Sequence, residues 1–118
     1  MKEHRAHLFA GLQRLVILES PYAGDVARNI AYGLRCLRDS LSRMEAPIAS
    51  HLLYTRVLDD NDPQQRALGI EAGLAWRRVA DASVVYTDYG ISSGMAHGIA
   101  LANDRGMDVE FRTIGQNA

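Results

Sequence analysis

The sequence predicts an α/β fold, a small doubly wound sheet of about four parallel strands with helices on both faces. Short apolar runs alternate with longer stretches whose apolar residues recur at helical spacing, which is the pattern of βαβ units. Two of the runs are continuously apolar, as expected for strands that are buried on both faces. The chain has 118 residues, 47% hydrophobic and 23% charged, which suits one domain of ordinary globular composition.

The first strand is expected at residues 15–18, where the run Leu-Val-Ile-Leu ends before Glu19-Ser20-Pro21. A helix is expected to begin after Asp25, a natural N-cap, and to end before Pro47. Its predicted apolar positions are Val26, Ile30, Leu34, Leu37, Leu41 and Met44. A second strand, short and polar in its middle, is expected at residues 48–53.

The second helix is expected to follow Asp62 as N-cap, with Pro63 as its first residue. Its predicted packing face consists of Leu68, Ala72, Ala75 or Trp76, and Val79. A continuous apolar strand follows at residues 83–87. The last elements are a helix capped by Ser92 or Ser93 that ends at Gly106, and an alternating, half-exposed strand at residues 108–113.

The strand order follows from the apolar pattern. The two continuous runs belong in the centre and the other two at edges, which gives the order 2-1-3-4 in a flavodoxin- or Rossmann-like sheet. The winding reverses between strands 1 and 3, and open α/β sheets bind ligands outside the carboxyl ends of the strands at such a point. The site is therefore expected in loops 19–25 and 88–94. Residues 1–12 are expected to form an N-terminal arm and residues 13–118 a single domain.

Composition limits the partners and cofactors. A net charge of −1 gives no electrostatic footprint for nucleic acid or an anionic membrane. The single cysteine, Cys36, excludes an internal disulfide. There is no apolar run of membrane-spanning length and no signal-peptide segment at the N-terminus, so the protein is expected in the cytoplasm. The histidines lack a paired ligand spacing, and neither GxGxxG nor GxxxxGK[ST] occurs, so no metal and no cofactor are expected.

Loop 88–94 leads into a predicted helix and is a candidate anion site. The N-terminus of a helix presents free N–H groups and a partial positive charge, so Ser92, Ser93 and Gly94 can cradle a phosphate. The same residues can equally serve only to cap the helix and form the turn.

Three segments resemble the nucleoside 2-deoxyribosyltransferase superfamily, namely SPYAGDVARNIAYGLR, SHLLYT and ADASVVYTDYGISSGMAHGIALANDRGMDVEF. Within it they are most similar to a group of small phage-associated proteins, and the resemblance covers about residues 14–114. It implies a small doubly wound α/β fold that often assembles into dimers or larger oligomers. It also implies an activity that cleaves or exchanges the N-glycosidic bond of nucleosides or nucleoside 5′-monophosphates, with a glutamate that attacks the anomeric carbon.

The resemblance further implies that Tyr22 lies beside the sugar or base and that residues 92–94 face a phosphate. One position departs from the superfamily pattern. The nucleophilic glutamate stands eight residues before the glycine that ends the third helix, here Gly106, and the chain has Gly98 at that place. This departure favours a binding protein without the chemistry, unless another carboxylate takes the role.

Two carboxylates are candidates for a catalytic role. Glu71 is the lone charge in an apolar helical stretch with two glycines, so it is either buried near a ligand or simply solvated. Asp88 ends a central strand, where it can accept a sugar hydroxyl, act on a proton or cap the next turn. The candidate substrate contacts near the other strand ends are Glu19, Ser20, Tyr22, Asp25 and His51. Glu19 ends the first strand as Asp88 ends the third, so it has the same alternatives.

Together these residues predict a protein that handles a small-molecule nucleoside or nucleotide, and that is an N-glycosidase or deoxyribosyltransferase if it is an enzyme. The alternatives are a binding module that senses or sequesters a nucleotide, and an interaction protein with a vestigial pocket. Ile70, Leu74 and Trp76 widen the apolar surface of the second helix beyond one core-facing stripe. This surface predicts a homodimer or a larger homo-oligomer.

Overall fold

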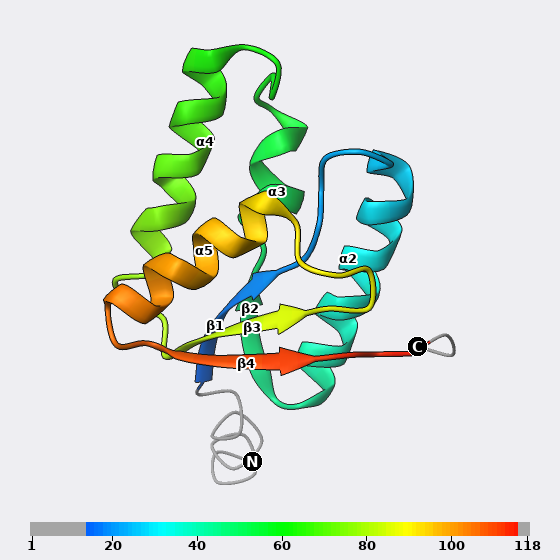
Figure 1. Ribbon diagram of the computed structural model, residues 1–118, viewed down its shortest axis with the longest axis vertical. Coiled ribbons are helices and arrows are strands. Elements are labelled where there is room, and N and C mark those ends of the chain that lie inside the picture. The colour runs from blue at the N-terminus through cyan, green and yellow to red at the C-terminus, as the bar shows by residue number, and fades with distance from the viewer. Residues whose placement is uncertain (1–13, 116–118) are drawn as a thin grey trace, which may run out of the picture.

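A computed structural model describes residues 14–115, and its strands form one parallel sheet in the predicted order, β2-β1-β3-β4 (Figure 1). The strands are β1 (Arg14–Glu19), β2 (Glu45–Ile48), β3 (Ala82–Tyr86) and β4 (Asp108–Arg112). The helices are α2 (Val26–Ser42), α3 (Ser50–Leu53), α4 (Pro63–Trp76) and α5 (Ser93–Asp104), with a 3-10 turn, η1 (Tyr54–Arg56), after α3. The N-terminal arm expected at residues 1–12 lies outside the described residues. None of the helices between residues 14 and 115 is long and apolar enough to cross a membrane.

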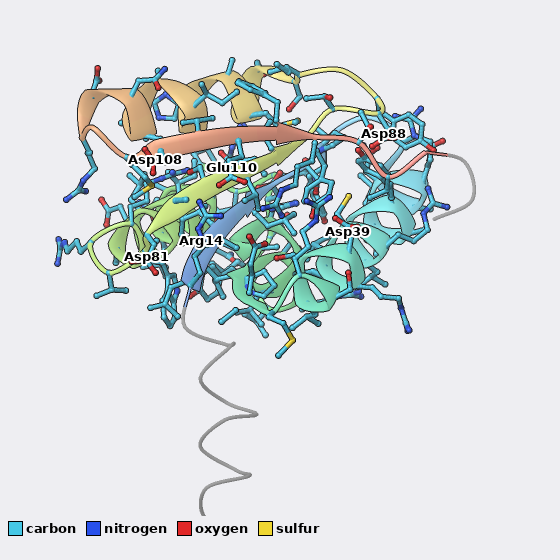
Figure 2. All side chains as sticks on the ribbon, turned by 90° about the horizontal axis from the view of Figure 1, so that it is seen from below. Arg14, Asp39, Asp81, Asp88, Asp108 and Glu110 are labelled. Carbon is cyan, nitrogen blue, oxygen red and sulfur yellow. The ribbon has the colours of Figure 1, made fainter. Side chains whose placement is uncertain are left out.

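The two faces of the sheet are covered by different helices, as Figure 2 shows with α5 on one side and α2 on the other. Val16 and Leu18 of β1 belong to the buried core with Tyr32 and Cys36 of α2. The alternate residues of β1 point to the opposite face, where Glu19 lies against α5. The sheet therefore separates the core beneath α2 from the region beneath α5 in which Glu19 lies.

The second strand lies earlier than the sequence predicted. Residues 45–48 form β2, and residues 50–53, expected to be strand, form α3. Pro47 cannot donate a backbone hydrogen bond, but β2 is an edge strand and tolerates it on its unpaired side. The short apolar run at residues 48–53 is shared between the strand end and the helix. His51 consequently lies on a helix and not at a strand end.

The buried face of α2 is largely polar and differs from the predicted apolar face. Leu34 and Leu41 are 52% and 54% exposed. The buried residues of α2 are Asn29, Tyr32, Gly33, Cys36 and Ser40. Several of these make hydrogen bonds to distant segments, such as the one that Ser40 Oγ donates to Glu45 Oε1 at 2.8 Å. Helical spacing identified an apolar stripe, but long-range polar partners determined which side of the helix packs.

Helix α4 packs through a glycine face and leaves its apolar side exposed. A Cβ at Gly73 would lie 2.7 Å from Ser50 Oγ, so the absent side chain allows α4 to approach α3 closely. Leu68 and Val79, predicted on the packing face, are 57% and 58% exposed. No residue of α4 is buried, and Figure 1 shows the helix extending beyond the edge of the sheet.

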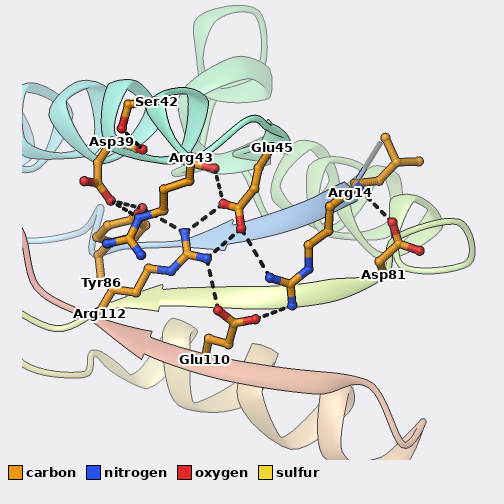
Figure 3. A network of polar contacts seen from close by, with 11 residues as sticks. Arg14, Asp39, Ser42, Arg43, Glu45, Asp81, Tyr86, Glu110 and Arg112 are labelled. Carbon is orange, nitrogen blue, oxygen red and sulfur yellow. Dashed lines mark hydrogen bonds and ion pairs between the residues drawn. The ribbon is translucent and has the colours of Figure 1, made fainter. Parts of the chain in front are cut away.

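A buried ion pair connects the two edge strands across the α2 face of the sheet (Figure 3). Arg112 of β4 donates from Nη1 and Nη2 to the Glu45 carboxylate of β2 at 2.8 and 2.7 Å. The Tyr86 hydroxyl accepts a further hydrogen bond from Arg112 at 3.2 Å, and Arg14 pairs with both Glu45 and Glu110. The Arg112 guanidinium lowers the pKa of Glu45, so this carboxylate is ionised at neutral pH.

Breaking this pair from one side should be strongly destabilising. Arg112→Met leaves the buried Glu45 carboxylate with only Arg14 and Ser40 as partners, so we expect the free energy of unfolding to fall by about 3–5 kcal/mol in urea denaturation. Adding Glu45→Leu removes both charges, and the double variant should lose less than the single one. Arg43→Met, which breaks an exposed ion pair with Asp39, should cost less than about 1 kcal/mol. A double variant that loses as much as the two single losses added together would contradict the prediction.

Candidate functional site

A cavity of about 420 Å³ lies at the carboxyl end of β1, the strand beside which the winding of the sheet reverses. It is bounded on one side by α5 and on the other by α3 and α4. Its polar lining includes Glu19, Ser20 and Tyr22 around the end of β1, His51 of α3, Arg77 after α4, and Ser92, Ser93, His97 and the backbone of Gly94 and Gly98 at the start of α5. Leu58, Ile70, Leu74 and Leu101 supply apolar wall.

Glu19 and Arg77 form a largely buried ion pair in this cavity. Arg77 Nη2 donates to Glu19 Oε2 at 3.2 Å, and the two side chains are only 7% and 15% exposed. Arg77 Nη1 donates to Ser83 Oγ on β3 at 3.1 Å, which fixes the guanidinium against the sheet. Burial raises the pKa of Glu19 to about 7, although the Arg77 charge acts in the opposite direction. The carboxyl group therefore changes protonation state close to neutral pH.

Gly98 provides the space in which the Glu19 carboxylate lies. A Cβ at position 98 would overlap Glu19 Oε2 and would lie 2.8 Å from Glu19 Cδ and 2.9 Å from Arg77 Nη2. Gly98 itself is buried. Only glycine at this position of α5 lets the helix pass so close to the ion pair.

Ser20 and His51 form a second polar contact in the cavity wall. Ser20 Oγ and His51 Nε2 are 2.7 Å apart, and Ser20 is buried. Burial lowers the pKa of His51 to about 4, so the imidazole is neutral at pH 7. A neutral imidazole has one donor and one acceptor nitrogen, and it can bind either a hydroxyl or a heterocyclic base.

Of the three residues at the start of α5 that are predicted to bind an anion, one caps the helix and two are exposed. Ser92 is the N-cap, and its hydroxyl accepts a hydrogen bond from the Met95 backbone N–H at 3.3 Å. Ser93 and Gly94 are exposed and border the cavity. The capping interpretation therefore describes Ser92, whereas the other two residues remain accessible to a ligand at the positive end of the helix.

Tyr22 lies on the loop that leads from β1 to α2 and borders the cavity. The buried Asn29 side chain donates hydrogen bonds to the backbone carbonyls of Tyr22 and Ala23 at 2.9 and 3.0 Å. These two bonds fix the loop relative to α2, so Tyr22 is held at the mouth of the cavity by the helix that follows it.

Three of the predicted site residues lie outside the cavity lining. The Asp88 carboxylate accepts hydrogen bonds from the Tyr32 hydroxyl at 2.6 Å and from the Ile114 backbone N–H at 3.0 Å. It ties β3 to the segment after β4, near which Figure 2 labels it. Asp25 caps α2, and Glu71 is exposed on α4. Asp88 and Asp25 thus have structural partners, and the structure does not bring Glu71 to the other candidates.

The sequence did not predict Arg77 as a site residue, and Gly98 was interpreted only as a position without the expected carboxylate. Arg77 stands 58 residues after Glu19, and nothing in the local sequence marks it as the partner of a strand-end carboxylate. A glycine within a helical stretch does signal a close approach, but the sequence does not identify the approaching group. Within residues 14–115, no three His, Cys, Asp or Glu side chains are grouped so that they could hold a metal ion.

The contact between α5 and Glu19 can be tested with two glycines of the same helix. Gly98→Ala forces the Glu19–Arg77 pair to move, and we expect a loss of about 1–3 kcal/mol in the free energy of unfolding. Gly94→Ala is the matched control, because a Cβ there meets only Ser92 Oγ, at 4.0 Å. Alanine favours a helix over glycine, so the control should lose no stability. Equal effects of the two substitutions in urea denaturation would contradict the proposed packing.

The fold and the family are identified by comparison with known proteins. A solved structure of a 2-deoxyribosyltransferase from the psychrotolerant bacterium Bacillus psychrosaccharolyticus matches with a TM-score of 0.61 and 15% identity, covering 84% of this chain and 72% of that chain. This likeness shows a shared fold. A comparison with curated proteins gives no match. The family described as "Domain of unknown function (DUF7768)" matches residues 14–112. The chain therefore belongs to the DUF7768 family of domains and has a deoxyribosyltransferase-like fold.

Proposed function

We propose that the protein binds a nucleoside or nucleoside 5′-monophosphate in this cavity and cleaves or exchanges its N-glycosidic bond. The observation that carries this proposal is a buried carboxylate, Glu19, in the same cavity as an accessible helix N-terminus. A buried carboxylate can act on a sugar carbon, and the N-terminus of a helix can bind a phosphate. The deoxyribosyltransferase-like fold, together with the sequence resemblance, supports the choice of nucleosides.

The cavity has the size and the mixture of surfaces that a nucleotide requires. Its volume of about 420 Å³ lies in the range of small-molecule sites. In the proposed pose the phosphate binds at Ser93 and Gly94, the sugar lies near Glu19, and the base contacts Tyr22 and His51. The net charge of −1 and the single cysteine, which is buried, support a small-molecule substrate in a reducing, cytoplasmic setting. Membership of the phage-associated branch stays a prediction from the sequence.

A second candidate function is nucleotide binding without chemistry. The ion pair with Arg77 favours it, because a carboxylate held by a guanidinium can be purely structural. Release of free base from a bound nucleoside separates the two functions. An enzyme releases base in proportion to its concentration, whereas a binding module returns the nucleoside intact.

Nucleotide binding is tested by thermal denaturation with panels of nucleosides and their 5′-monophosphates, since a ligand of the folded state raises the melting temperature. Ser93→Asp places a negative charge at the proposed phosphate position, so it should weaken a monophosphate at least about tenfold more than its nucleoside in calorimetry. Asn103→Asp has the same charge change at the exposed far end of α5 and should affect both ligands equally. Equal losses for both ligands in Ser93→Asp would remove the phosphate from the proposal.

We also propose that the protein forms a homo-oligomer through α4. The helix has exposed apolar residues and no buried residue. This pattern is typical of a helix that another chain covers. A second copy is the commonest partner of such a surface.

The proposed oligomer can be tested with two matched substitutions, one on α4 and one on α2. Leu68→Glu on α4 should dissociate the oligomer in light scattering, because it places a charge on the exposed apolar face of the proposed contact. Leu34→Glu introduces the same charge on the exposed apolar stripe of α2 and should leave the α4 contact intact. Dissociation by Leu34→Glu alone would move the interface to α2, and a monomeric parent protein would refute the proposal.

A further inference from the structure

The side of the cavity formed by α3, η1 and α4 suits the base of a nucleotide. Tyr54, Leu58, Ile70 and Leu74 line this side with apolar surface that a flat heterocycle can cover. His51 of α3 lies on the same side and adds a polar side chain. In a small-molecule site the apolar wall supplies contact area, and a few polar groups determine which ligand is accepted. The hydrogen-bonding state of His51 is therefore central to the choice of base.

Several other polar side chains on this side are already paired or are exposed. The Gln65 amide is hydrogen-bonded to neighbouring residues of its own segment. Thr55 Oγ1 donates to the backbone carbonyl of His51 at 2.7 Å. Asp60 and Arg66 are exposed, so water competes for their hydrogen bonds. His51 is half-buried, and a hydrogen bond from its ring to a ligand discriminates more strongly than one made in open water.

The Ser20 hydroxyl determines which nitrogen of the His51 ring carries a proton. Ser20 Oγ and His51 Nε2 are 2.7 Å apart, so one of them donates to the other. Ser20 Oγ makes no other hydrogen bond to a described residue, and Ser20 is only 6% exposed. If Nε2 were the donor, the hydroxyl hydrogen would be buried without an acceptor, which costs free energy. The hydroxyl therefore donates to Nε2.

The neutral His51 ring then carries its proton on Nδ1. Burial lowers the pKa of His51 to about 4, so the ring holds a single nitrogen-bound proton at pH 7. Nδ1 makes no hydrogen bond to a described residue. Within residues 14–115, the buried side-chain polar atoms that lack a partner are Arg77 Nε and Arg112 Nε, so Nδ1 is accessible. His51 thus presents an unpaired N–H donor to the cavity and no free acceptor.

We propose that His51 selects bases that carry an oxygen, and not an amino group, at purine C6 or pyrimidine C4. The selection rests on the proposed function, because it requires a nucleoside in the cavity. The exocyclic group at that position lies at the end of the base away from the sugar. An oxygen there accepts the hydrogen bond from Nδ1, whereas an amino group presents a second donor and leaves the His51 N–H unpaired.

The preferred ligands are therefore nucleosides or nucleotides of hypoxanthine, guanine, uracil or thymine, and those of adenine and cytosine are disfavoured. Ser20 has an indirect part in this selection. It acts through His51 as a positioning residue, since its hydroxyl keeps the ring proton on Nδ1.

The position of the ring proton can be tested without a ligand. In the full-length protein labelled with ¹⁵N at histidine, long-range ¹H–¹⁵N correlation spectra distinguish a protonated ring nitrogen from one that only accepts. Loss of one set of signals in His51→Asn identifies the His51 ring. We expect the proton on Nδ1 at pH 7, and we expect the form with the proton on Nε2 to appear in Ser20→Ala. A proton on Nε2 in the parent protein would overturn the proposal.

The selection of the base is tested by calorimetry with two pairs of ligands. These are 2′-deoxyinosine with 2′-deoxyadenosine and 2′-deoxyuridine with 2′-deoxycytidine, each as the nucleoside and as the 5′-monophosphate. In each pair the member with the oxygen should bind at least about tenfold more tightly. His51→Phe keeps an aromatic ring but removes the donor. The affinity for the oxygen-bearing members should then fall at least about tenfold, while that for the amino members changes little.

Two hydroxyl substitutions separate the effect of the ring proton from a general effect on the site. Ser20→Ala allows His51 to carry its proton on either nitrogen, so the affinity for the amino members should rise and the preference should fall to about threefold or less. Thr55→Val is the matched control, because the hydroxyl that it removes bonds to the backbone of His51 and not to its ring. It should keep the preference of the parent protein, and an equal loss of preference in both variants would overturn the role of Ser20.

The possible outcomes separate this selection from the function on which it rests. If no nucleoside or nucleotide binds the parent protein, the proposed function fails and the selection fails with it. If both members of each pair bind equally well, or the amino members bind more tightly, nucleoside binding stands and the selection is overturned. If His51→Phe keeps the preference of the parent protein, another residue selects the base and the assignment to His51 is overturned.

Discussion

The ion pair between Glu45 and Arg112 is the constraint on which the arrangement of the sheet depends. It joins the two edge strands, β2 and β4, across both central strands. Two desolvated charges are stable only in close contact, so the pair fixes the edge strands relative to each other. Ser40 of α2 and Tyr86 of β3 bond to the same cluster, which fixes the helix as well. The polar buried face of α2 follows from this cluster.

On the opposite face of the sheet, a second buried arginine, Arg77, also connects separate elements. Arg77 follows α4 directly and bonds to Glu19 and Ser83, which lie on the two central strands. Although α4 itself has no buried residue, this arginine links the outer helical pair to the sheet through two polar contacts. The cavity lies between these parts, so its width depends on an ion pair that is also a candidate for the chemistry.

The parts of the fold that the sequence could predict are those determined by local pattern. No distant partner is needed to recognise the apolar runs of β1 and β3 or the helix caps Asp25, Asp62 and Ser92. The strand order and the expected end of the sheet for a cavity follow from the two apolar runs. The start of β2 and the packing face of α2 depend on Arg112, which is 67 residues from Glu45. The same limit applies to the site, where Arg77 and Glu19 meet only in three dimensions.

The contact between Glu19 and Gly98 couples two positions in the evolution of the family. A larger residue at 98 requires the Glu19–Arg77 pair to move or one of its side chains to be smaller, since both would fill one volume. Related sequences with a larger residue at 98 should therefore differ from this chain at 19 or at 77.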